Sequence, residues 1–256
     1  MKKSKTIDRA DDPNLIPGIY NYCNRWCERC SFTARCMNYE GEEAADPGSD
    51  RFWQRIHESF EETQELLQGI AEQQGIDFDD FTGGQAIGGE SEPGIVDARE
   101  DDLSRAAMKY GDLVEAWFDA HEQTFERAQN WLDQNFQLGI REEETREVAT
   151  QTGDAIEVIR WYQHQVYVKL MRALSGKDDW PDRPGREDRL SDTDGSAKVA
   201  LIAMDDSLAA WGRLQSYVPE LSDEILDVMF LLEKLRRNTE KKFPHARHFV
   251  RPGFDE

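Results

Sequence analysis

The residues best suited to chemistry are four cysteines, Cys23, Cys27, Cys30 and Cys36, which are the chain's entire cysteine content. Their spacing is C-x3-C-x2-C-x5-C. Thiolates are strong ligands for zinc and for iron–sulfur clusters. Because disulfides are disfavoured in a reducing cytosol, so tight a grouping indicates metal binding rather than cross-linking. The pattern therefore predicts one metal centre held by all four thiolates.

The spacing also bears on which metal is bound. Structural zinc sites usually join two short knuckles across a long intervening loop. The contiguous spacing here favours a [4Fe-4S] cluster, whose separate iron corners are reached by closely spaced ligands. Zinc remains the alternative, because the neighbouring Arg25, Arg29 and Arg35 would offset the negative charge of either site.

The first three cysteines resemble the CxxxCxxC motif of radical-SAM enzymes. Arg29 stands where those enzymes usually carry an aromatic residue, and Cys36 can occupy the fourth iron position that they leave open. No alternation of strand and helix patterns follows the motif, as their α/β barrel requires. We therefore do not assign the chain to that family.

A second candidate site consists of four polar residues on or beside the apolar faces of expected helices, namely His121, Glu157, His164 and Asp206. They could form a carboxylate–histidine site for acid–base chemistry or a second metal. A four-cysteine site joined to a bundle resembles the architecture of rubrerythrin-like proteins. The Glu-x-x-His pairs of ferritin-like sites are absent, however, and an ion-pair network or a solvated face is the alternative.

Helical periodicity dominates the rest of the chain and predicts an all-α fold, a helical bundle of about five helices. The longest seam alternates four- and three-residue steps through Leu103, Ala107, Tyr110, Val114, Trp117, His121, Thr124, Ala128 and Trp131. The expected helices cover residues 52–75, 99–136, 142–174 and 196–218, with a fifth beginning after Pro219 and capped by Ser222.

The helix expected at 142–174 carries two stripes. The main stripe is Ala155, Ile159, Tyr162, Val166, Leu170 and Ala173, and the second is Glu157, Trp161, His164, Val168 and Met171. A helix with apolar residues on two faces is predicted to lie in the middle of a bundle.

These patterns predict a four-cysteine metal-binding module at residues 1–49 and a helical bundle at 50–256. The bundle has long loops at 76–98 and 175–195 and ends in a basic C-terminal tail. The cations involved are Lys234, Arg236, Arg237, Lys241, Lys242, Arg247 and Arg251. They are expected either to dock an acidic partner or to fold back onto the protein itself.

The formal net charge of -21 disfavours nucleic-acid binding, because such a surface repels phosphates. No apolar run is long enough to span a membrane, and the N-terminal residues lack the apolar stretch of a secretory signal, so we expect a cytoplasmic location. The sequence thus predicts a metalloprotein for electron transfer or redox-linked regulation, with a protein partner. A zinc-stabilised interaction module and a redox enzyme with a second site are the alternatives.

Overall fold

A computed structural model describes residues 12–39, 98–139, 142–176 and 192–255. Within these ranges the regular secondary structure is entirely helical, so the protein is an all-α helical bundle as predicted. The chain forms two compact units. The first contains the described residues 12–39 and 251–255, and the second contains those between 98 and 250.

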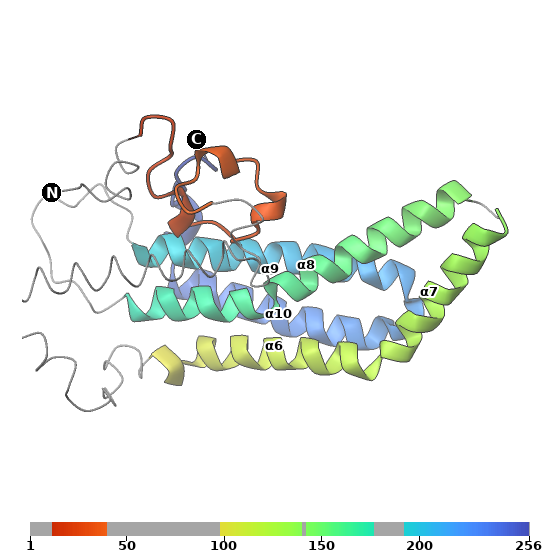
Figure 1. Ribbon diagram of the computed structural model, residues 1–256. Coiled ribbons are helices and arrows are strands. Elements are labelled where there is room, and N and C mark those ends of the chain that lie inside the picture. The colour runs from red at the N-terminus through yellow and green to blue at the C-terminus, as the bar shows by residue number, and fades with distance from the viewer. Residues whose placement is uncertain (1–11, 40–97, 140–141, 177–191, 256) are drawn as a thin grey trace, which may run out of the picture. The chain divides into compact units, whose positions relative to one another are not determined.

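The second unit is the bundle (Figure 1). Its helices are α6 (Asp102–Ala120), α7 (Glu122–Gln137), α8 (Glu142–Ser175), α9 (Asp192–Tyr217) and α10 (Ser222–Lys242). The most extensive helix contact joins α8 to α9. In Figure 1, α7 turns away from the line of α6 and runs with the first half of α8 as a two-helix arm. None of the described helices is long and apolar enough to cross a membrane.

The apolar stripes of three helices form the core as predicted. The whole main stripe of α8, from Ala155 to Ala173, is buried. So are Met204, Trp211 and Leu214 on α9, and the predicted stripe of α10, which is Ile225, Val228, Leu232 and Leu235. Burying these side chains supplies the main driving force for folding, because each removes apolar surface from water.

The single helix predicted at 99–136 is instead broken at His121. In a continuous helix the Trp117 carbonyl would accept a hydrogen bond from the His121 backbone N–H. Here that N–H donates to the Phe118 carbonyl at 3.2 Å, and the ring Nδ1 of His121 lies 2.7 Å from the Trp117 oxygen. Since a carbonyl only accepts, Nδ1 is the donor. The imidazole N–H of His121 therefore replaces its backbone N–H as the donor to the Trp117 carbonyl, and α6 ends at Ala120.

The break at His121 also changes which residues of the next helix are buried. The predicted seam continued through Ala128 and Trp131, but both are exposed, and Trp131 retains 60% of its accessible surface. Leu132 is the buried residue of α7. The prediction was wrong beyond His121 because a change of axis resets the helical phase.

The second stripe of α8 is not a buried face, which corrects the sequence interpretation. Glu157, His164 and Val168 are exposed, and Trp161 and Met171 are only partly covered. Burying the two ionisable groups would have cost their hydration without a compensating charge. Only the main stripe of α8 packs as core.

Two helix starts differ from the sequence interpretation. The helix expected from residue 196 begins at Asp192, where the carboxylate pairs with Arg172 of α8 at 2.8 Å. Ser222 does not cap α10: the N-cap is Leu221, and the Ser222 hydroxyl accepts from the Gln215 side chain at 2.7 Å. The helix predicted at 52–75 and most of both predicted loops lie outside the described residues.

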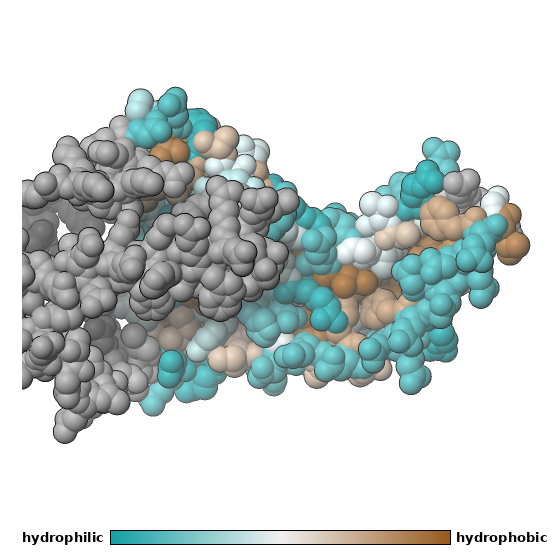
Figure 2. Space-filling model, viewed as in Figure 1, coloured by the Kyte–Doolittle hydropathy of each residue, from teal (hydrophilic) through white to brown (hydrophobic). Residues whose placement is uncertain are grey.

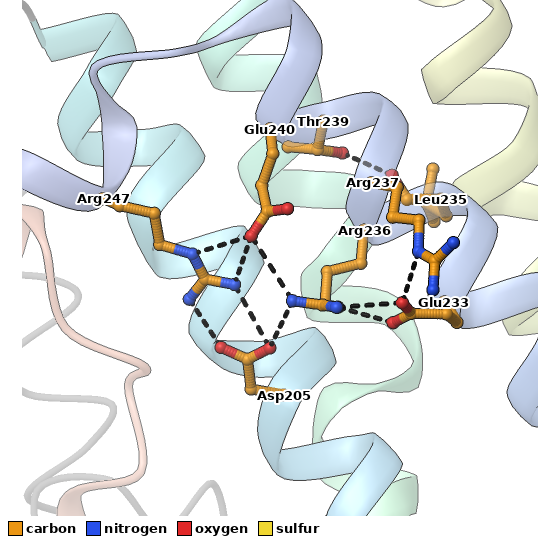
Figure 3. A network of polar contacts seen from close by, with 8 residues as sticks. All are labelled: Asp205, Glu233, Leu235, Arg236, Arg237, Thr239, Glu240 and Arg247. Atoms are coloured by element: carbon orange, nitrogen blue, oxygen red, sulfur yellow. Dashed lines mark hydrogen bonds and ion pairs between the residues drawn. The ribbon is translucent and has the colours of Figure 1, made fainter.

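The basic residues near the end of α10 fold back onto the bundle (Figure 3). Arg247 reaches Asp205 of α9 at 2.5 Å and Glu240 at 2.9 Å. Arg236 contacts the same two acids and also Glu233, at 2.6 Å. Hydrogen bonds from Arg236 and Arg237 lower the pKa of Glu233 to about 2, so this carboxylate stays ionised in neutral solution.

One more cation of this group joins two helices. Lys242 pairs with Asp101, whose carboxylate also caps α6 by accepting from the Leu103 N–H at 2.9 Å. Of the two behaviours predicted for the basic residues, the bundle therefore shows folding back at Arg236, Lys242 and Arg247.

A pair of glycines allows the contact between α6 and α8 to be tested. A Cβ added at Gly111 of α6 would lie 3.2 Å from both the Gln163 carbonyl oxygen and the His164 Nδ1, whereas one added at Gly153 of α8 would meet nothing within 4 Å. Alanine favours the helix at both positions by about 0.5–1 kcal/mol. Crowding applies only at Gly111, so Gly111→Ala should be less stable than Gly153→Ala by about 1–3 kcal/mol in urea unfolding. Equal stabilities of the two variants would show that α6 and α8 accommodate the added Cβ at Gly111 without loss of packing energy.

Candidate metal centre

The cysteine segment is built from three short 3-10 helices. They are η1 (Ile19–Asn21), η2 (Cys27–Arg29) and η3 (Thr33–Arg35). Cys27 begins η2, whereas Cys30 and Cys36 are the residues that directly follow η2 and η3. Such single turns change the chain direction every few residues, which suits a segment that must present several side chains to one centre.

Cys30 and Cys36 occupy equivalent positions in two similar turns. Cys30 has φ/ψ of -89°/125° and donates its N–H to the Cys27 carbonyl at 3.1 Å. Cys36 has φ/ψ of -105°/123° and donates to the Thr33 carbonyl at 3.2 Å. Cys30 and Cys36 therefore each follow a hydrogen-bonded turn and have an extended backbone conformation.

The turn between Cys23 and Cys27 contains a strained residue. Arg25 has φ of 59°, the only positive value at a non-glycine among the described residues. This left-handed conformation costs an ordinary side chain about 1–3 kcal/mol and is maintained only where the surrounding structure requires it. Arg25 and both flanking cysteines line the same pocket, so the strained turn accompanies the gathering of the thiols.

All four cysteines line that pocket, whose accessible volume is about 20 Å³. None forms a disulfide, and each is partly buried. The remaining lining residues are Ile19, Tyr20, Asn24, Arg25, Trp26, Thr33, Tyr39 and Phe254. The four predicted ligands thus lie around one pocket, and their binding of a metal stays a prediction.

Hydrogen bonds reach the sulfurs of Cys30 and Cys23. The Phe32 backbone N–H donates to Cys30 Sγ at 3.4 Å, a kind of contact that stabilises a thiolate. The Cys23 thiol donates to the Tyr20 carbonyl at 3.4 Å, which requires the protonated form. Burial, followed by the charges of Cys23, Glu28, Cys30 and Cys36, raises the pKa of Cys27.

The donors surround the pocket without converging on one point. Among the described residues, no three His, Cys, Asp or Glu side chains are arranged as ligands of a single metal ion. Trp26 is buried at the pocket, with the Arg29 guanidinium 4.0 Å from its ring centroid. This cation–π contact holds the guanidinium over the Trp26 ring.

In the described part of the bundle, the four candidates do not form a metal-ligating group. His121 Nε2 lies 3.2 Å from the Glu224 carboxylate of α10, which with its Trp117 contact gives it a structural role at the helix junction. His164 contacts the side chain of its neighbour Gln163 at 2.9 Å. Glu157 and Asp206 are exposed. A catalytic role for any of them stays an untested prediction.

The bundle also has a hollow that sequence reasoning missed. It lies where α7 leaves α6, and in Figure 2 apolar surface shows between polar borders in this region. It is lined by Phe118, Asp119, Glu122, Phe125, Glu126, Gln129, Asn130, Ile156 and Arg160. None of the four predicted bundle candidates is among these lining residues. The hollow lies where the helix breaks at His121, and the uninterrupted period of the sequence gave no sign of that break.

Comparison with protein-family models, with curated protein sequences and with solved structures gave no match for this chain.

Proposed function

We propose that Cys23, Cys27, Cys30 and Cys36 hold a [4Fe-4S] cluster, and that the protein is a cytoplasmic carrier or sensor of electrons. The observation that carries the proposal is the shared pocket of the four thiols. When bound, such a cluster supplies one-electron transfer. Because a carrier must exchange electrons with another molecule, the proposal includes a protein redox partner.

The spacing of the cysteines is the reason for preferring a cluster to zinc. Structural zinc sites usually join two short knuckles across a long intervening loop. The four cysteines here lie within fourteen residues, and a cluster takes one thiolate at each of its separate iron corners.

Residues other than the ligands have roles that the proposal requires. The Phe32 N–H supports the Cys30 thiolate, and hydrogen bonds to sulfur tune the potential of iron–sulfur sites. Trp26 and Tyr20 cover the pocket and limit the access of water. Arg25 lines the pocket and would place positive charge near four thiolates that otherwise repel one another.

Metal analysis and an absorption spectrum of protein purified without oxygen test the proposal. We expect about four irons per chain and broad absorption near about 400 nm from charge transfer between thiolate and iron. The absorption should bleach on reduction with dithionite and return on reoxidation. A colourless protein carrying one zinc per chain would overturn the cluster and support a zinc-stabilised interaction module instead.

A further inference from the structure

One residue that lines the pocket of the four cysteines comes from the C-terminal segment of the chain. Phe254 lines it together with residues 19–39, and the described residues 251–255 belong to the same compact unit as the cysteine segment. This contact joins parts of the sequence separated by the entire bundle. It is therefore a tertiary feature of the site rather than a product of local spacing.

Gly253 directly precedes Phe254. Its φ of 76° is left-handed, a conformation that disfavours any residue with a Cβ. The neighbouring space is also closed, because an added Cβ would lie 2.8 Å from Ile16 Cδ1 and 3.1 Å from Ile19 Cδ1. Glycine is thus favoured by the left-handed turn, and an added Cβ would also have to displace the ends of the Ile16 and Ile19 side chains.

Phe254 is then held by contacts on two sides. Its ring meets that of Phe32 edge to face, with centroids 5.1 Å apart, and the Arg251 guanidinium lies 5.0 Å from its centroid. Arg251 is fixed in turn by Asp255, with Nη2 and Oδ1 2.8 Å apart. Phe32 is the residue whose N–H donates to Cys30 Sγ, so Phe254 packs directly against a residue that supports a thiol.

We propose that Phe254 is a positioning residue of the cysteine site, and that the Gly253 turn holds it there to restrict access of water, oxygen and chelators to the sulfurs. Where the proposal concerns a bound cluster it rests on the proposed function. Its claim about access to the thiols does not depend on any metal. Shielding by an aromatic side chain changes the dielectric and the solvent exposure of such a site.

The test uses the full chain with Phe254→Ala and Gly253→Ala. The matched control is Gly139→Ala, since Gly139 also has a positive φ, of 63°, but an added Cβ there meets nothing within 4 Å. In the reduced, metal-free protein, the thiols of both test variants should react with 5,5′-dithiobis(2-nitrobenzoic acid) roughly tenfold faster than those of the wild type, because the pocket opens more readily. Gly139→Ala should react at the wild-type rate.

A second measurement uses protein loaded with iron and sulfide. Phe254→Ala should bind as much iron as the wild type but lose its visible absorption roughly tenfold faster in air or in excess EDTA. Phe254→Leu, which keeps an apolar side chain, should restore most of the protection in both measurements. Far-UV circular dichroism of each variant should match the wild type.

The two proposals fail in different ways. If no variant binds iron, and neither does the wild type, the cluster is wrong while the thiol rates still decide the role of Phe254. Wild-type thiol rates in a folded Phe254→Ala variant would overturn the role of Phe254 and leave the cluster standing. If Gly139→Ala exposes the thiols as much as Gly253→Ala does, strain in any left-handed turn is responsible and the shielding role is wrong.

Discussion

Cys27→Ser should abolish metal binding while leaving the bundle helical. Cys27 is the second of the four proposed ligands, lies in the pocket shared by all four thiols, and begins the turn that Cys30 follows. A serine hydroxyl is a poor replacement for a thiolate, so one of the four ligands is lost. We expect the iron content of the purified variant to fall to background. The helical circular dichroism signal should not change, because the core residues of the bundle lie outside the cysteine segment.

Two further variants, at Cys36 and at Thr33, are compared with Cys27→Ser. Cys36→Ser should also lose the metal, since Cys36 ends the second of two equivalent turns. Thr33→Ala alters the same pocket without removing a thiol and should keep the full metal content. Full metal content in Cys36→Ser would show that the fourth ligand has been misassigned.

Trp211→Ala should lower the free energy of unfolding of the bundle by about 3–5 kcal/mol. Trp211 is fully buried, and its ring lies 4.9 Å from that of Trp117 and 5.9 Å from that of Phe118. Its Nε1–H donates to the Tyr110 hydroxyl at 3.3 Å. Burial raises the pKa of Tyr110 to about 12, so the hydroxyl stays protonated and its oxygen remains an acceptor. Urea unfolding followed by circular dichroism measures the loss.

Trp131→Ala is the matched control, because it removes the same side chain from a site on α7 that is 60% exposed. It should change the free energy of unfolding by no more than about 0.5 kcal/mol, as is usual for surface substitutions. Similar losses in the two variants would mean that Trp131 is covered in solution or that Trp211 is not a central core residue.

The sequence by itself determined the features that depend on local spacing. The helical period placed α8, α9 and α10 and selected their buried stripes, because a residue's face on a helix follows from its position along the chain. The same reasoning grouped the four cysteines, whose short separations keep them within one small segment. These features needed no knowledge of distant residues.

The tertiary structure decided what depends on partners far along the chain. The break at His121 accompanies a contact with Glu224 of α10, and a seam of uninterrupted period gave no sign of it. The second stripe of α8 has a helical period, yet the surrounding helices leave it exposed. Phe254 lines the cysteine pocket next to Gly253, which lies close to Ile16 and Ile19. Periodicity specifies which face a residue occupies, whereas the packing of distant segments decides which faces are covered and which side chains meet.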